Sequence, residues 1–206
     1  MNAMSDLMDP SINQDFLQRQ QLRIKAPNTK VAASMFMKWY AKVYLDEVMD
    51  SVLWEPHIRI IPLQACVVTE ELNLQIDRGK VRDAPSRKEG WEHIFSHHLT
   101  KVVLAMNKTT NLPLIILWEN IAVRLNSYLR KAVQNYPEYE QEVIKTAKEI
   151  QELDGKAFGQ PFHPLVRYLT APSDLTKQKV RGTCCFYHKL EKEKDLAYCL
   201  VCPIKN

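Results

Sequence analysis

Apolar residues recur at helical spacing in four stretches of the chain. The pattern covers residues 29–54, 91–106, 114–129 and 137–153, with a proline at position 56 just after the first stretch. The last stretch opens with glutamates and carries its lysines later, as the helix dipole favours. A period near 3.6 residues is typical of helices that bury one face, so four helices are predicted, the first ending at Pro56.

Between the first two helical stretches the pattern changes to that of β-strands. Residues 57–82 contain runs of β-branched residues followed by alternation through Leu72, Leu74 and Ile76, and Pro62 indicates an edge or a bulge. We predict two or three short strands here. The fold class is therefore α+β, a predominantly helical body with a small antiparallel β-sheet and a cysteine-rich C-terminal lobe.

One domain accounts for the 206 residues. Within it the pattern separates a polar leader at residues 1–28, a helical body with the small sheet at 29–170, and a lobe at 171–206. Five glycines and eleven prolines favour helices with short connections over an all-β fold.

Charge and hydropathy narrow the classes of function. The 28 basic and 24 acidic residues are interspersed and give a formal charge of +4, which does not indicate a nucleic-acid partner. No stretch reaches the roughly 20 apolar residues of a membrane span. The first residues lack the basic and apolar regions of a secretion signal, so a cytoplasmic location is expected.

Four of the five cysteines lie close together in the sequence. Cys184 and Cys185 are adjacent, thirteen residues separate them from Cys199, and Cys199 and Cys202 form a C-x2-C turn that directs two sulfurs to one metal. Cytosolic thiols are kept reduced, which favours metal ligands over a disulfide. Adjacent cysteines diverge and suit a two-iron cluster better than one small tetrahedral ion. The alternatives are structural zinc, and a redox disulfide or no ligand at all.

The sequence around these cysteines resembles the ferric-siderophore reductases of the FhuF family. The cysteine pair follows "VRGT" and precedes an aromatic and basic stretch and C-x2-C-P. Two further segments are similar to family helices: "ASMFMKWYAKVYL" and "LPLIILWENIAVRL", in which Leu117, Trp118 and Asn120 match and Glu119 replaces a glycine. The spacing between the two cysteine pairs is longer than in the family, with "EKEKD" at residues 191–195 as the surplus.

The resemblance implies a function and a cofactor. The four cysteines Cys184, Cys185, Cys199 and Cys202 would hold a 2Fe-2S cluster, which would reduce siderophore-bound Fe(III) and release Fe(II). The expected partners are a ferric siderophore and an external electron donor, which is a ferredoxin or a flavin reductase. Peripheral attachment to an uptake transporter is a further option. The alternative is a non-enzymatic siderophore-system binding or scaffold protein with structural zinc.

Six polar residues are candidates for substrate contact. Asn120 lies in an apolar helix and is either a buried hydrogen-bonding residue or a substrate contact, while the other five lie near the cysteines or in the loop before them. The candidates are Asn120, His163, Arg167, Arg181, His188 and Lys189. Arg181, His188 and Lys189 beside the cysteines would offset the negative charge of an all-thiolate cluster and attract anionic chelates. His163 and Arg167 are either contacts for an anionic ligand or ordinary packed loop residues.

Cys66 and the three histidines of the second helical stretch are expected to have structural roles. Cys66 lies in an apolar strand-like run and is expected to be a small core residue. His93 and His97 have the spacing of metal ligands, but the pattern places them on an exposed polar face, whereas His98 falls in the apolar stripe and should be buried. No glycine-rich phosphate loop, dinucleotide fingerprint or nucleophile elbow is present.

Overall fold

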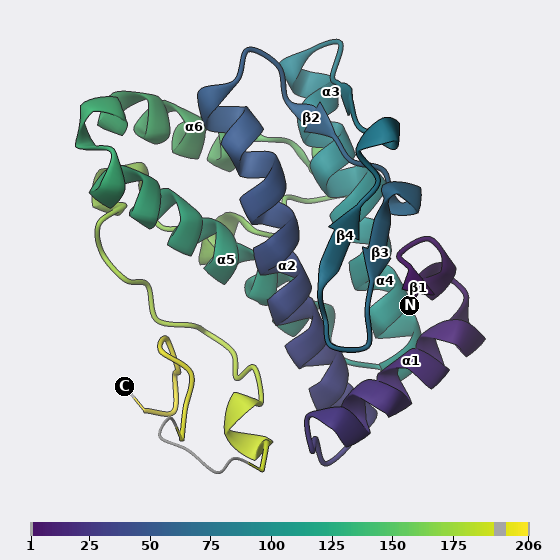
Figure 1. The fold of residues 1–206 in the computed structure, drawn as a ribbon. Coiled ribbons are helices and arrows are strands. Elements are labelled where there is room, and N and C mark those ends of the chain that lie inside the picture. Colours follow the sequence, from purple (N-terminus) through teal and green to yellow (C-terminus); the bar gives the residue numbers. More distant parts are fainter. Residues whose placement is uncertain (1, 192–196, 206) are drawn as a thin grey trace.

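A long central helix organises the protein, seen here in a computed structural model that describes residues 2–191 and 197–205. The main helices are α1 (Pro10–Arg23), α2 (Thr29–Trp54), α3 (Arg87–Glu92), a π-helix (His93–Leu99), α4 (Thr100–Thr110), α5 (Leu114–Asn135) and α6 (Glu140–Glu152). Figure 1 shows α2 running through the middle, with α5 beside it and the strands on its other side. The predominantly helical α+β fold is thus confirmed.

The ends of α2 follow from local chemistry. Asn28 caps its start, because the side chain accepts a hydrogen bond from the Val31 amide at 3.1 Å. The helix stops at Trp54, and Glu55 is extended (φ −116°, ψ 156°), as the residue before a proline must be. The predicted end of the helix at Pro56 is therefore confirmed.

The strands form two small antiparallel sheets. They are β1 (Asn2–Ala3), β2 (Arg59–Ile60), β3 (Cys66–Val68), β4 (Leu74–Ile76) and β5 (Arg82–Asp83), ordered β1-β3-β4 in one sheet and β2-β5 in the other. Val67 of β3 pairs with Gln75 of β4. Leu72, expected to begin the alternation, instead lies in the intervening turn with φ +62°.

The first 28 residues, which composition describes as a polar leader, are built into the body. β1 pairs with β3, and the α1 side chains Phe16 and Leu17 are completely buried with Met4 and Leu7 in the main core. Only one face of α1 packs against α2 and α4, so most residues of the segment can be polar even though the helix is part of the core. The core therefore extends over both sides of α2.

The second predicted helix contains a π-helical segment between α3 and α4. Buried His98 stacks on Tyr44 and makes hydrogen-bond contacts of 2.7 Å with the Tyr40 hydroxyl and 2.8 Å with the Ile61 carbonyl. This confirms the expected burial of His98. His97 is exposed as predicted, but His93 is half-buried, because i to i+5 hydrogen bonding changes which residues share a face.

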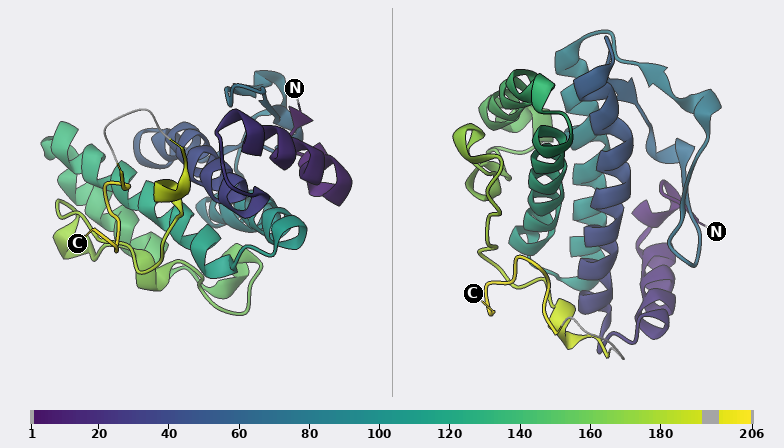
Figure 2. Two further views of the ribbon diagram at one scale, coloured as in Figure 1. Left: turned by 90° about the horizontal axis from the view of Figure 1, so that it is seen from below. Right: turned by 60° about the vertical axis from the view of Figure 1, so that its left-hand side comes forward.

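The cysteine lobe, defined as described residues 171–191 and 197–205, lies at one end of the α2–α5 pair. Figure 2 shows the chain returning along the outside of α5 before the lobe reaches the start of α2. Only two one-turn 3₁₀ helices, Pro172–Asp174 and Tyr187–Lys189, occur among these residues. No helix in the described part of the chain is long and apolar enough to cross a membrane.

Candidate metal centre and adjoining pocket

Three of the four clustered cysteines lie together in the lobe. Cys185, Cys199 and Cys202 are buried and form a separate packed group with Met35 of α2 and lobe side chains that include Tyr187. All five cysteines of the chain are free thiols. The structure thus brings the two halves of the sequence motif to one place.

Backbone contacts bring these two halves together. The Arg181 amide donates to the Val201 carbonyl at 3.0 Å, which places the approach to the first cysteine pair beside the second pair. The Cys202 amide donates to the Cys199 carbonyl at 3.1 Å and closes the C-x2-C turn. The surplus segment "EKEKD" falls mainly on residues 192–195, which lie outside the described residues.

Cys184 is half-buried and lies outside the packed group of three cysteines. Its Sγ accepts a hydrogen bond from the Phe186 amide at 3.3 Å and lies 3.5 Å from His188 Nδ1. Phe186 has a left-handed backbone (φ +65°), an uncommon conformation for a non-glycine residue. This turn points the amide at the sulfur, a contact that stabilises a thiolate ligand.

The donor set fits an iron–sulfur group in its chemistry. Four free thiols in one lobe, one of which already accepts a backbone hydrogen bond, are the ligands such groups use. Among the described residues, no three His, Cys, Asp or Glu side chains have an arrangement that would hold a single metal ion directly. The same four sulfurs would also suit zinc, so the donor set alone does not choose the metal.

Burial keeps the Cys199 thiol protonated in the absence of metal. It raises the pKa of Cys199 to about 11, the neighbouring Cys185 adds to this rise, and Lys38 opposes it. Burial also lowers the pKa of the Lys38 ammonium, whereas Cys185 and Cys199 act to raise it. Binding of a metal through Cys199 must therefore displace a proton from its sulfur.

A buried ion pair attaches the lobe to α5. The Arg181 side chain has no exposed area, and its Nη2 lies 3.3 Å from Glu119 Oε2, without the alignment of a hydrogen bond. Glu119 accepts hydrogen bonds from the amides of Gly182 (2.6 Å) and Thr183 (2.9 Å) and from the Thr183 hydroxyl. We call Glu119, Asn120, Arg181, Gly182 and Thr183 the clamp.

Asn120 extends the clamp to α2 and the first cysteine pair. Its Oδ1 accepts from Arg181 Nη1 at 2.8 Å, and its amide nitrogen donates to the Ser34 carbonyl at 3.1 Å. The Ser34 hydroxyl donates to the Cys185 carbonyl at 2.9 Å. Asn120 and Arg181 are therefore buried residues that position the lobe, and neither faces solvent where a substrate would bind.

The other predicted substrate contacts are divided between two regions. His163 is half-buried, its Nε2 lies 2.8 Å from the Ile150 carbonyl, and desolvation lowers its pKa, which is the arrangement of a packed loop residue. Arg167 is exposed over the ring of Tyr168. Only His188 and Lys189 belong to the turn that follows the first cysteine pair, and Lys189 lies over the Phe186 ring.

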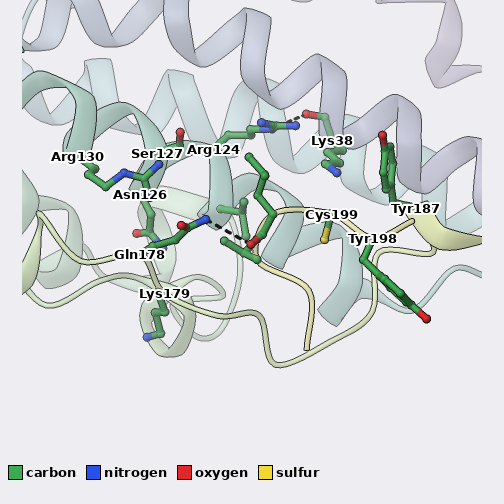
Figure 3. A pocket seen from close by; sticks show the side chains of 13 residues that line it. Lys38, Arg124, Asn126, Ser127, Arg130, Gln178, Lys179, Tyr187, Tyr198 and Cys199 are labelled. Atoms are coloured by element: carbon green, nitrogen blue, oxygen red, sulfur yellow. Dashed lines mark hydrogen bonds between the residues drawn. The ribbon is translucent and has the colours of Figure 1, made fainter. Parts of the chain in front are cut away.

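Residues of α2, α5 and the lobe line a pocket of about 250 Å³. Figure 3 shows the side chains that line it. Cys199 lies in its wall, and four cations line it. These are Lys38, Arg124, Arg130 and Lys179. The sequence carries no clear signal for these four cations, because other charged residues are present on both helices and the pocket forms only when distant segments meet.

Comparison with known proteins does not assign the chain to a family. No model of a known protein family matches the chain, and a search of curated proteins finds no match. The resemblance of the cysteine motif to the FhuF family thus rests on the residues that carry it.

Proposed function

We propose that the protein is a one-electron reductase of ferric chelates, with a 2Fe-2S cluster held by Cys184, Cys185, Cys199 and Cys202. The observation that carries this proposal is the position of Cys199, which belongs both to the buried cysteine group and to the wall of the open pocket. A chelate bound in the pocket would touch a ligand of the electron-carrying group. Such proximity is what a one-electron transfer needs.

A bound 2Fe-2S cluster supplies single electrons at a potential set by its charge, hydrogen bonds and exposure. The residues around the cysteines govern these factors. The Phe186 amide donates to the Cys184 sulfur, and Ser34 fixes the Cys185 carbonyl. Lys38 provides positive charge beside Cys185 and Cys199.

Iron release follows from the chemistry of the chelate. Hard oxygen ligands such as hydroxamates, catecholates and carboxylates bind Fe(III) far more tightly than Fe(II), so one electron per iron loosens the metal without breaking a covalent bond. That electron comes from a separate donor, a ferredoxin or a flavin reductase, because the sequence has no dinucleotide-binding loop. The reaction belongs in the cytoplasm, with attachment to an uptake transporter as an additional possibility.

Metal analysis of the anaerobically purified protein is the first test. We expect a brown protein with visible absorption and two iron and two sulfide ions per chain, in accordance with the stoichiometry of a 2Fe-2S cluster. A colourless protein with one zinc ion would instead support the alternative, a non-enzymatic scaffold or binding protein of the siderophore system.

Stopped-flow mixing then tests the activity. The reduced protein should recover its oxidised visible spectrum on mixing with ferric citrate or a ferric hydroxamate, and one Fe(II) should appear in a ferrous trap per electron held. NADH alone should leave the oxidised spectrum unchanged. A reduced cluster that stays reduced for minutes with a panel of ferric chelates would overturn the reductase proposal.

A further inference from the structure

The pocket beside Cys199 has an unusual charge for this protein. Basic and acidic residues are nearly balanced over the whole chain, 28 against 24, yet the described pocket lining includes four cations and no carboxylate. Two helices and the lobe contribute these cations, so no single run of sequence produces the charge. Such convergence raises the local concentration of anions.

Three of the four cations keep all or most of their side-chain donors for a ligand. Arg130 has no hydrogen-bond or ion-pair partner among the described residues, and Arg124 uses only its Nε, which donates to the Lys38 carbonyl at 3.0 Å. The Lys38 ammonium lies 4.5 Å from the centroid of the Tyr187 ring. Lys179 differs, because its ammonium already donates two of its three hydrogen bonds to the carbonyls of Arg167 and Leu169.

The rest of the lining favours an organic anion over a simple inorganic one. Val123, Leu200 and Val201 provide apolar walls, and Tyr187 and Tyr198 add aromatic surface. The volume of about 250 Å³ is slightly below the roughly 300–1,000 Å³ of sites that enclose a whole drug-sized ligand. It therefore suits a small polycarboxylate or one acidic arm of a larger molecule.

We propose that this pocket binds carboxylate groups, and that the preferred substrates are ferric chelates with free carboxylates rather than neutral or cationic ones. The planar guanidinium groups of Arg124 and Arg130 match a carboxylate with paired hydrogen bonds. Lys38 adds a further positive charge in the same pocket, beside Cys199. The identification of the ligand as an iron chelate rests on the proposed reductase function, whereas carboxylate binding itself does not.

Calorimetric titration of the metal-loaded protein with citrate tests the binding site. We expect saturable binding that weakens as salt is raised. Arg130→Gln should weaken it about tenfold, the loss of one charge-assisted hydrogen bond, and Arg130→Lys should weaken it less. Lys131→Gln, the matched control, makes the same charge change one residue away, outside this pocket, and should leave the affinity within about twofold.

The substrate preference is tested by reoxidation of the reduced protein with ferric citrate and with a neutral ferric trihydroxamate. Arg130→Gln should slow the first reaction about tenfold at subsaturating chelate and leave the second unchanged. Absence of citrate binding, or equal weakening by Arg130→Gln and Lys131→Gln, would overturn the carboxylate site while leaving the reductase function intact. Citrate binding that depends on Arg130, in a protein that reduces no ferric chelate, would support the site and refute the reductase function.

Discussion

The helical body and the cysteine lobe are stabilised by different means. The body buries one continuous apolar core that runs from Met4 to Leu169 and also includes Leu175 of the lobe, whereas Leu200 of the lobe is 77% exposed. The lobe is attached instead by the clamp and by its cysteines, with Phe186 packed against the body. A segment without a core of its own depends on polar contacts, and the proposed cluster would add to them, so changes there should remain local while changes in the body should affect the whole fold.

The largest expected effect is the difference between replacing a cysteine of the lobe and replacing a cysteine of the body. Cys199→Ser or Cys202→Ser should abolish the visible absorption and the bound iron, because loss of one thiolate leaves an iron atom without a ligand. Cys66→Ala, in the core strand β3, should keep both. A Cys66 variant that lost the absorption while a Cys202 variant kept it would contradict the ligand assignment.

Breaking the clamp should release the lobe and leave the body folded. Arg181→Met removes one partner of a fully buried ion pair, which costs about 3–5 kcal/mol. Hydrogen exchange should then rise in peptides 175–191 and 197–205 and stay low in α2 and α5. The double variant Glu119→Gln with Arg181→Met should cost less, because no uncompensated charge is left. Equal loss of protection in α2 would show that the two regions are not separable.

Acid should weaken the body through His98. Burial lowers the pKa of His98 to about 3, below its value of 6.5 in an unfolded chain, so protons bind preferentially to the unfolded state. The free energy of unfolding should be highest above pH 6.5 and fall as the pH drops from 6.5 towards 3. At pH 5 this one group should lower the free energy of unfolding by about 2 kcal/mol relative to its value above pH 6.5.

Urea unfolding at a series of pH values measures this effect. His98→Gln should flatten the pH dependence, although it lowers stability at neutral pH by removing the contacts with Tyr40 and Ile61. The control His97→Gln, at an exposed site of the same π-helix, should keep the wild-type slope. An unchanged slope in the His98 variant would show that another group titrates.

The smallest effect concerns the start of α2. Asn28→Ala removes the cap on the Val31 amide and should lower the stability of the body by about 1 kcal/mol, whereas Asn28→Ser should restore most of it. Thermal unfolding followed by circular dichroism measures this difference. A destabilisation confined to the lobe would contradict the division into two regions.

Much of the body could be predicted because its apolar residues have a regular period. The stripe from Trp91 to Met106 is buried in the structure even though a π-helical segment interrupts it, since the core constrains which residues face inwards. The strand β1 could not be predicted, because two residues carry no period and its pairing with β3 joins distant parts of the chain. Local pattern therefore reveals helices better than it reveals their partners.

The clamp and the pocket show what local pattern leaves out. Glu119 was noted only as a replacement for a glycine, and its role appears when residues 63 or 64 positions away in the sequence are brought next to it. The pocket likewise combines Lys38, Arg124 and Lys179 from three segments. The cysteines were easier to select, because their close spacing in the sequence is itself the signal.

The clamp also has a consequence for the order of assembly during synthesis. Ser34, Glu119 and Asn120 are made before Arg181, and they lie on α2 and α5, which are each other's main packing partners. The surface that receives the lobe can therefore form while the cysteines are still being translated. Under the proposed function, we expect insertion of the cluster to be the last step of maturation, after the body has folded and the thiols lie against it.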